Sequence, residues 1–181
     1  MNVQLNSRAT GSGKIVTITY DRQSKLNSLS AAGIAELKTA FQEVAEDKEL
    51  RGLVFTGAGS KSFVGGADIN ELNELNEKTS RDFITCLHEL FVLIRKIKVP
   101  TIARVNGFSL GAGMELAAAC DIRIASDAAV FGMPEVKVGV PSVIEAALLP
   151  RLIGWGRTNY LVLTGENIDA TTAYDWGFVE K

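Results

Sequence analysis

The sequence has 181 residues, of which 46% are hydrophobic and 22% charged, with a formal net charge of −2. This is the composition of an ordinary globular domain, and it lacks the long basic run of a nucleic-acid binder. No stretch reaches the roughly 18 apolar residues of a membrane span, and a single histidine with two cysteines offers no transition-metal cluster. We therefore expect no nucleic acid, no membrane and no metal among its partners.

The sequence gives two indications of the cellular compartment. The opening stretch MNVQLNSRATGSGK lacks the apolar core of a signal peptide. Cys86 and Cys120 both lie in apolar helical surroundings, which predicts buried free thiols in a reducing compartment. We therefore expect a cytoplasmic protein.

Strands and helices alternate through the first half of the chain. KIVTITY (14–20) has the β-branched alternation of a strand, and apolar residues recur at helical spacing through 30–47. LVFTG follows as a short strand, and a glycine-rich loop leads to a helix whose apolar stripe runs from Phe83 to Ile97, just before Pro100. His88 lies beside that stripe, and we expect it to be a partly exposed surface residue.

The second half continues the alternation. TIARVNG predicts a strand, 112–120 a buried helix, and DIRIAS another strand. Helical stretches around 143–152 and 157–164 precede a capped turn at Asp169. This order predicts an α/β fold with largely parallel strands and right-handed crossovers. With no linker or low-complexity tract, we expect a single domain over 1–181.

One carboxylate stands out in the segment VNGFSLGAGMELAAACD (105–121). A helix beginning near Ala112 would be apolar on every face, and such a helix is normally buried. Burying Glu115 there costs several kcal/mol unless its charge is compensated or its hydrogen bonds are satisfied. Glu115 is therefore either a structural residue that binds the backbone or a catalytic residue.

Several glycine patterns resemble nucleotide-binding motifs without matching them. In GFSLGAG the glycines fall at 107, 111 and 113, the wrong order of spacings for a dinucleotide fingerprint. GAGSKS has Ser60 where a phosphate loop needs glycine before lysine, and GSGK at 11–14 lacks the first glycine of that loop. A nucleophile elbow is also missing, so a serine triad is excluded.

Three segments do fit a chemistry together: SFVGGADI (62–69), GFSLGAGMELAAACD (107–121) and FGMPEVKVGVP (131–141). The first two place small-residue turns where backbone N–H groups approach a ligand closely. The second turn leads into a helix N-terminus, whose first amides have no internal partners and suit an oxyanion. Glu115 follows within one helical turn, and Glu135 in the third segment adds a second carboxylate.

With these motifs, the sequence resembles the crotonase family, the enoyl-CoA hydratase/isomerase superfamily. The resemblance rests on DRQSKLNSLS, SFVGGADI, VPTIARVNGFSLGAGMELAAACDIRIAS, FGMPEVKVGV and LTGENIDATTAYDWGFV, in the family's order and spacing. It implies an α/β crotonase-like spiral of ββα repeats, and a homotrimer or dimer of trimers. The family continues into a C-terminal helical segment, whereas this chain ends at DWGFVEK, so we expect that segment to be absent.

The resemblance also assigns roles to individual residues. It implies that Ala67 and Ala112 hold the thioester oxygen through their backbone N–H groups, and that Glu115 and Glu135 are the catalytic glutamates. Ala112 is a departure, because family members commonly have glycine there. The residues implied to bind the substrate and its coenzyme A portion are Lys25, Leu26, Ala67, Asp68, Ile69 and Gly111. Coenzyme A enters only as part of the thioester, and no separate cofactor is implied.

The implied chemistry needs these residue types. Adding water to a 2-enoyl thioester builds negative charge on the carbonyl oxygen, and losing one amide donor to that oxygen typically costs about 2.7 to 4 kcal/mol. Two neighbouring carboxylates push each other's pKa values apart, so that one acts as base and the other as acid. We expect Glu115 to take a proton from water and Glu135 to deliver one to Cα.

For some residues a structural role competes with the functional one. Glu115 could instead be a structural carboxylate bound to backbone, although the functional interpretation is favoured. Asp68, at the end of GGAD, is better explained as the cap of a short helix. For Lys25, a solvated loop lysine and a phosphate contact are equally supported. Glu145 adds a third carboxylate, which we expect to be an exposed first-turn residue favoured by the helix dipole.

The resemblance thus implies an enoyl-CoA hydratase, a lyase of fatty acid metabolism. Two alternatives stay open. A Δ3,Δ2-enoyl-CoA isomerase needs only Glu135 and the oxyanion hole, and a catalytically poor acyl-CoA-binding subunit needs neither glutamate. Val143 and Ile144, bulkier than the glycines many hydratases carry there, are expected to reshape the acyl end of the pocket.

Overall fold

Two sheets organise the chain, of which the computed structural model describes residues 2–181. The larger sheet has the order β1-β2-β3-β5-β7 and the smaller one β4-β6-β8-β9. The strands of the larger sheet are β1 (Val3–Thr10), β2 (Gly13–Tyr20), β3 (Leu50–Gly57), β5 (Thr101–Val105) and β7 (Ile122–Ala125). Those of the smaller sheet are β4 (Ser62–Val64), β6 (Phe108–Leu110), β8 (Val130–Gly132) and β9 (Asn167–Asp169).

Each turn of the chain adds one strand to each sheet. β3, β5 and β7 lie side by side and parallel in the larger sheet, while β4, β6 and β8 do the same in the smaller one. Only the pairs β1–β2 and β8–β9 are antiparallel among the described strands. This is the predicted α/β spiral of ββα repeats, and it places the loops after β4 and β6 next to each other.

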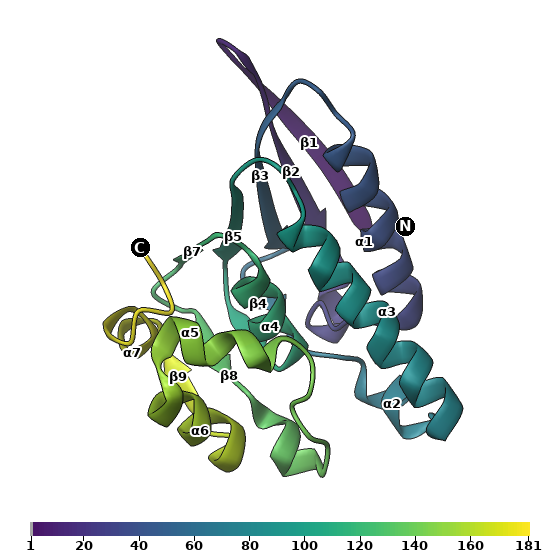
Figure 1. The fold of residues 1–181 in the computed structure, drawn as a ribbon, viewed down its shortest axis with the longest axis vertical. Coiled ribbons are helices and arrows are strands. Elements are labelled where there is room, and N and C mark those ends of the chain that lie inside the picture. The colour runs from purple at the N-terminus through teal and green to yellow at the C-terminus, as the bar shows by residue number, and fades with distance from the viewer. Residues whose placement is uncertain (1) are drawn as a thin grey trace.

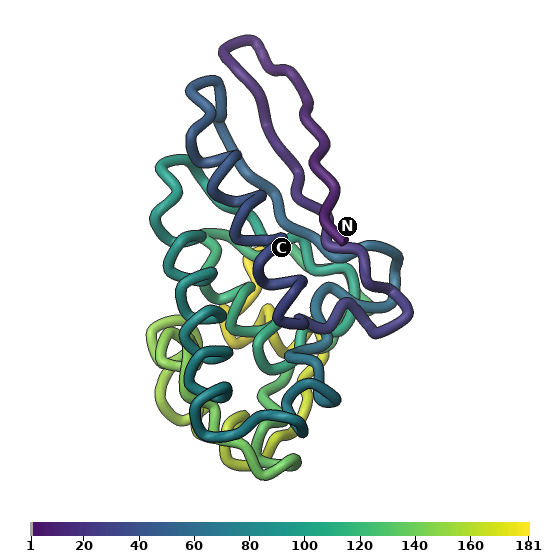
Figure 2. Tube along the Cα trace, turned by 90° about the vertical axis from the view of Figure 1, so that its right-hand side faces the viewer, coloured from purple at the N-terminus to yellow at the C-terminus, as the bar shows by residue number. Residues whose placement is uncertain are grey.

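Helices connect successive strands of the spiral. The α-helices are α1 (Ala31–Ala45), α2 (Ile69–Asn73), α3 (Glu77–Arg95), α4 (Ala112–Ala119), α5 (Leu149–Ile153), α6 (Trp155–Thr164) and α7 (Ala170–Asp175). Short 3₁₀ helices are η1 (Gln23–Lys25), η2 (Pro134–Val138) and η3 (Glu145–Leu148). In Figure 1 α1 and α3 run alongside each other, and Figure 2 shows the β1–β2 hairpin projecting at one end of the long axis.

Local signals explain where the two longest helices begin. The Ser30 hydroxyl caps α1 by accepting a hydrogen bond from the Gly33 amide at 3.0 Å. Asn76 and Thr79 form a reciprocal capping box at the start of α3. The predicted apolar stripe of α3 is buried from Phe83 to Ile94, as its 3.6-residue spacing requires.

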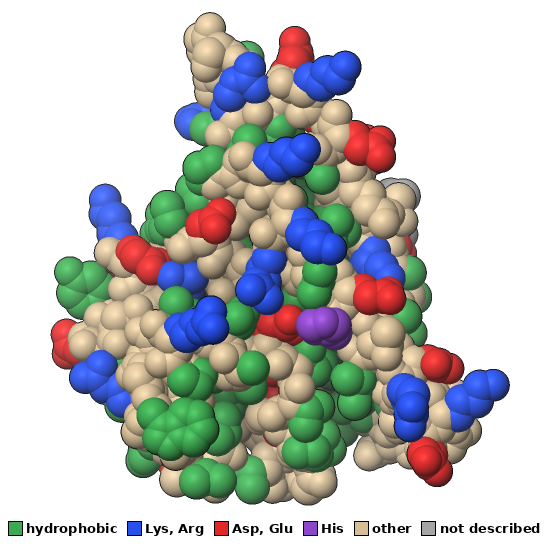
Figure 3. All heavy atoms as spheres, in the orientation of Figure 1, with side chains coloured by type: hydrophobic (Ala, Val, Ile, Leu, Met, Phe, Trp, Pro, Cys, Tyr) green, Lys and Arg blue, Asp and Glu red, His purple; other side chains and the backbone are tan. Residues whose placement is uncertain are grey.

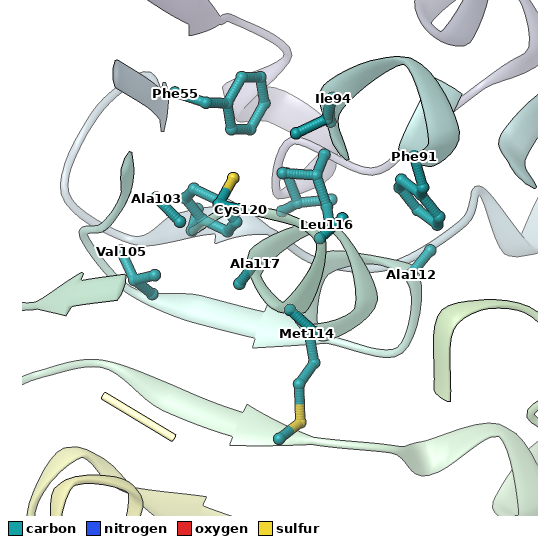
Figure 4. Packing of buried hydrophobic residues seen from close by; sticks show 14 of the residues in the cluster. Phe55, Phe91, Ile94, Ala103, Val105, Ala112, Met114, Leu116, Ala117 and Cys120 are labelled. Atoms are coloured by element: carbon teal, nitrogen blue, oxygen red, sulfur yellow. The ribbon is translucent and has the colours of Figure 1, made fainter. Parts of the chain in front are cut away.

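Helix α4 lies at the centre of the core. All eight of its residues are buried, and it contacts β4, β6, α3, α5 and η3. Figure 4 shows Leu116 directed toward Phe55 and Ile94, while Met114 extends from the other side of the helix. The prediction of a buried helix over 112–120 is confirmed to within one residue.

The fold differs from the sequence-based expectations in several places, and one is strand β4, which lies within the expected glycine-rich loop. Strand β1 was not predicted, because its residues are largely exposed and carry little apolar signal. Cys86 is exposed, because it lies outside the buried stripe of α3, whereas Cys120 is buried as predicted. Within residues 2–181, no helix is both long and apolar enough to cross a membrane.

Candidate active site

Two neighbouring loops form one edge of the candidate site. Strands β4 and β6 are parallel neighbours, so the loops that follow them leave the smaller sheet at the same edge. A Cβ atom on Gly66 would lie 3.3 Å from the Leu110 carbonyl oxygen, and one on Gly113 only 2.0 Å from that of Val64. The absence of side chains at these two glycines is what lets the loop over 65–68 pack against the start of α4.

Both loops present backbone amides that donate no hydrogen bond to any group within residues 2–181. Ala112 is the first residue of α4, and the N-cap residue Gly111 supplies no side-chain hydrogen bond. On the other loop, the Gly66 carbonyl oxygen accepts a hydrogen bond from the Leu29 amide, and the Asp68 amide donates to the Leu29 carbonyl oxygen. The Ala67 amide, between Gly66 and Asp68, donates no backbone hydrogen bond within the described chain. Two unpaired N–H groups on adjacent loops suit an anionic oxygen.

A third loop is held against the first by the backbone of Leu26. This residue has a left-handed φ of 53°, which ends η1 just after Lys25. Its carbonyl oxygen accepts hydrogen bonds from the Gly65 amide at 2.9 Å and the Ser62 hydroxyl at 2.7 Å. Lys25, which is exposed, and Leu26 therefore lie beside the loop that carries Ala67.

Asp68 has the structural role that its sequence position predicts. Its carboxylate caps α2 by accepting a hydrogen bond from the Asn70 amide at 3.0 Å, and it forms a 2.6 Å ion pair with Arg22. Burial acts to raise the pKa of Asp68, but Arg22 and the Asn70 amide outweigh it and hold that pKa below its ordinary value. The next residue, Ile69, is 56% exposed and faces solvent at the same edge.

Glu115 is almost completely buried on α4, with 3% of its surface exposed. Its Oε1 atom accepts a hydrogen bond from the Ala146 amide at 2.8 Å. Burial raises the pKa of Glu115 to about 7, and the charges of Glu135 and Glu145 add to the effect, although the Ala146 hydrogen bond opposes it. Glu115 is thus a carboxylate with a backbone partner and a pKa near neutral pH.

Glu135 approaches the same region from η2. Its Oε1 atom would be 2.4 Å from a Cβ on Gly111, so the carboxylate packs directly against the residue that precedes α4. The Ser142 hydroxyl donates a hydrogen bond to its other oxygen at 3.1 Å. Burial raises the pKa of Glu135, which favours the protonated form.

The prediction for Glu145 was wrong. We expected an exposed first-turn residue, but Glu145 is 3% exposed and its Oε1 atom lies 3.0 Å from Nδ1 of His88. The reason is tertiary: η3 packs on α4, which turns its first residue inward toward α3. His88 keeps a side chain that is 53% exposed, as predicted for a surface histidine. In Figure 3 the histidine lies at the surface with a carboxylate side chain beside it.

Three hydrogen-bond partners of the carboxylates at this site were not predicted: the Ala146 amide, the Ser142 hydroxyl and the His88 ring. Ala146 lies 31 positions from Glu115 and His88 lies 57 positions from Glu145. No periodicity or short motif links residues at such separations. Only Ser142, seven positions from Glu135 on a turn after Pro141, was within reach of a local argument.

A comparison with family models identifies the family to which this chain belongs. The family model described as Enoyl-CoA hydratase/isomerase matches residues 10–181. The chain belongs to the enoyl-CoA hydratase/isomerase family. The resemblance to this family, carried by five ordered motifs, is confirmed.

Two curated relatives within the enoyl-CoA hydratase/isomerase family are similar over most of this chain. The Short-chain-enoyl-CoA hydratase of Clostridium acetobutylicum is 41% identical over 170 residues, and the Crotonyl-CoA hydratase of Syntrophomonas wolfei is 40% identical over 169. Each alignment covers 93% of this chain. The chain spans 65% of the length of each relative.

The enoyl-CoA hydratase/isomerase fold is also shown by a solved structure. The enoyl-CoA hydratase from Bacillus anthracis superimposes with a TM-score of 0.93 at 35% identity, covering 99% of this chain and 69% of that one. The predicted crotonase-like fold is therefore confirmed. Within residues 2–181, no group of three or more His, Cys, Asp or Glu side chains is arranged to hold a metal ion.

Proposed function

We propose that this protein is an enoyl-CoA hydratase that adds water across the double bond of a 2-enoyl-CoA thioester. The observation that carries the proposal is the juxtaposition of the buried Glu115 and the half-buried Glu135 at the start of a helix with unpaired amides. Both relatives described above are named as hydratases, one of them for crotonyl-CoA.

The proposed reaction begins with the thioester carbonyl oxygen between the amides of Ala67 and Ala112. Glu115, ionised, takes a proton from water as the water oxygen bonds to Cβ. The electrons of the double bond move onto the carbonyl oxygen, where the two amides stabilise the enolate. Glu135, protonated, then delivers its proton to Cα and the carbonyl re-forms. The proton held by Glu115 returns to Glu135 before the next cycle, so one water molecule is added overall.

A general base is most effective when its pKa lies near the working pH, and burial brings the pKa of Glu115 to about 7. Burial raises the pKa of Glu135 as well, which moves this carboxyl toward its acid form. The division of work between the two carboxyls is proposed from their positions, not from these shifts. The Ser142 hydroxyl and the close approach of Gly111 fix the position of this second carboxylate.

The substrate contacts form a further part of the proposal. Lys25 and Leu26 would meet the coenzyme A portion together with Ala67 and Ile69, since the Leu26 carbonyl ties this loop to Gly65. Asp68 would support the loop through Arg22 rather than touch the substrate. Coenzyme A arrives with the substrate, and no separate cofactor is needed for the proton transfers described.

Glu115 favours hydration over the alternative of a Δ3,Δ2-enoyl-CoA isomerase. Moving a double bond requires one proton shuttle, for which Glu135 suffices. A second buried carboxylate with a pKa of about 7 is unnecessary for that reaction but necessary for activating water. A binding subunit would need neither carboxylate. In such a protein the burial of Glu115 would destabilise the fold without serving a reaction.

The test is the hydration of crotonyl-CoA by the purified chain, followed as loss of the conjugated thioester absorbance. Glu115→Gln should lower kcat by about 10² to 10⁴, the usual contribution of a general base. Glu135→Gln should lower hydration and isomerisation of a 3-enoyl-CoA alike. Hydration at the wild-type rate in both variants would contradict the proposal, and isomerisation without hydration would establish the alternative. Unchanged acyl-CoA affinity without either reaction would point to a binding subunit.

Assembly and location complete the proposal. Exposed apolar side chains on α6, including Trp155 at 70% and Leu163 at 72%, support a homotrimer or dimer of trimers, which light scattering would test. The two free cysteines support a reducing, cytoplasmic location. Fatty acid metabolism is the corresponding role.

A further inference from the structure

The pair formed by His88 and Glu145 adjoins the segment that binds Glu115 and has no part in the reaction steps described above. Glu145 is buried, and its Oε1 atom is 3.0 Å from Nδ1 of His88, whose side chain is half exposed. The pair therefore connects solvent at the surface of α3 with the carboxylates in the core. Burying a charged carboxylate costs free energy unless an opposite charge or hydrogen bonds compensate for the lost water.

The backbone around Glu145 is what holds Glu115. The next residue, Ala146, donates its amide to Oε1 of Glu115 at 2.8 Å, and the preceding residue, Ile144, is half-buried against the core. Because the Glu145 side chain is anchored to α3 through His88, the position of this segment depends on the pair. The Glu145 carboxylate is also close enough for its charge to act on Glu115.

We propose that His88 and Glu145 are positioning residues for Glu115: the pair holds the segment 144–146 against the Glu115 carboxylate and couples its charge to that of a surface histidine. This inference rests on the proposed hydratase function, because Glu115 is the base of that reaction. When His88 is protonated, its charge offsets that of Glu145 and so weakens the repulsion that Glu115 experiences.

Other charged groups near α4 do not replace the pair. Glu135 on η2 is the second charge that acts on Glu115, whereas β4 and β6 carry no titratable side chain. Arg95 of α3 and Arg151 of α5 line a separate hollow of about 220 Å³ at the other end of α4, beside Cys120. On α3 itself, Glu89 next to His88 is bound by Lys38 at 2.6 Å.

Two substitutions change the charge of the pair in opposite directions. Glu145→Gln removes a negative charge beside Glu115, so the acid limb of kcat/KM should move to lower pH by roughly one unit. His88→Gln removes the side chain whose protonated form offsets Glu145, so the same limb should move to higher pH. A merely structural role would lower the rate in both variants without opposite shifts. Shifts in the same direction, or none, would overturn the inference.

The experiment needs a matched control and a readout independent of turnover. Glu43→Gln removes the same charge from an exposed position on α1 and should leave the limb in place. Carbon-13 NMR of glutamate-labelled protein titrates the Glu115 carboxyl directly, with Glu115→Gln identifying its signal. If this titration moves as expected in a protein that does not hydrate crotonyl-CoA, the coupling stands and the proposed function fails. Hydration with an unmoved titration refutes the coupling alone.

Glu145→Gln could also destabilise the chain, because its partner His88 would lose a carboxylate. His88→Gln keeps the test decisive in that case, since this side chain is half exposed and its replacement leaves the core unchanged. Thermal unfolding of both variants identifies any loss of folded protein. An unmoved Glu115 titration in folded His88→Gln protein would by itself overturn the coupling.

Discussion

The Oε1 atom of Glu115 accepts a hydrogen bond from the backbone amide of Ala146, 2.8 Å away and 31 positions further along the chain. This contact joins α4, the most deeply buried helix, to η3, which follows the loop after Glu135. Because the donor is a backbone group, its position depends on the path of the chain rather than on the side chain at 146. The site can therefore be tested through the backbone as well as through its carboxylates.

The first prediction concerns Gly111, whose Cα faces the Glu135 carboxylate. Gly111→Ala would place a methyl group 2.4 Å from Oε1 of Glu135, at a residue whose φ is +51°. The carboxylate must move, and we expect kcat for hydration to fall at least tenfold. Gly139→Ala is the control, since Gly139 also has a positive φ, +72°, but open space around it. Equal losses of activity in the two variants would mean that strain, not displacement of Glu135, is responsible.

The second prediction compares two helical glycines by their effect on stability. A methyl group at Gly113 would meet the Val64 carbonyl oxygen at 2.0 Å, so Gly113→Ala should lower the free energy of unfolding by about 1 to 3 kcal/mol. Gly156 on α6 has nothing within 4 Å of such a methyl group. Gly156→Ala should therefore raise stability by about 0.5 to 1 kcal/mol. Urea denaturation measures both, and a stable Gly113→Ala variant would contradict the close packing of α4 on β4.

The third prediction uses one substitution at two buried serines. The Ser62 hydroxyl is hydrogen-bonded to the carbonyl oxygens of Leu26 and Phe108, at 2.7 and 3.2 Å. The Ser109 hydroxyl, in the neighbouring strand, has no partner among the described residues. Ser62→Ala should cost about 1 kcal/mol and raise KM for acyl-CoA by loosening the Leu26 loop, whereas Ser109→Ala should be neutral or stabilising. Denaturation curves showing a larger loss at Ser109 would refute this.

The fourth prediction is a pH dependence of stability. The pKa of Glu115 rises from 4.5 in the unfolded chain to about 7 in the folded one, so the folded state holds an extra proton between these values. Stability due to this group is complete below pH 4.5, declines as pH rises, and becomes constant above about 7. Relative to Glu115→Gln, the wild-type protein should lose up to roughly 3 kcal/mol over this window. Denaturation near pH 4 and near pH 8 measures the difference, and a constant gap would show that folding leaves the pKa of Glu115 unchanged.

The local parts of this architecture could be predicted from the sequence. The apolar spacing of α3, the uniformly apolar α4 and the glycines around it all act over a few residues. The burial of Glu145 was not predictable, because it depends on η3 meeting α3, whose His88 is 57 positions away. Strand β1 was not predicted because it is held by hydrogen bonding to β2 and its mostly exposed residues carry no apolar pattern. Cys86 shows that apolar neighbours in sequence do not define a buried face.

The same distinction applies to the candidate site. Gly111, Ala112 and Glu115 lie within one stretch of chain, so their proximity could be inferred from helical geometry. Asp68 could be identified as a cap from its position before a short helix, as its contact with Asn70 shows. How Glu115 is held, by an amide that follows a third carboxylate, is set by tertiary packing alone.

Because every residue of α4 is buried, this helix leaves little freedom for evolutionary change. A new side chain on it would have to fit between the two sheets while leaving Glu115 in place. By contrast, Val136, Val138, Val140 and Val143, which flank the same carboxylates, are all at least 39% exposed. Divergence toward a different substrate is therefore expected to accumulate in the segment 136–144, while the position of the proposed base, Glu115, stays unchanged.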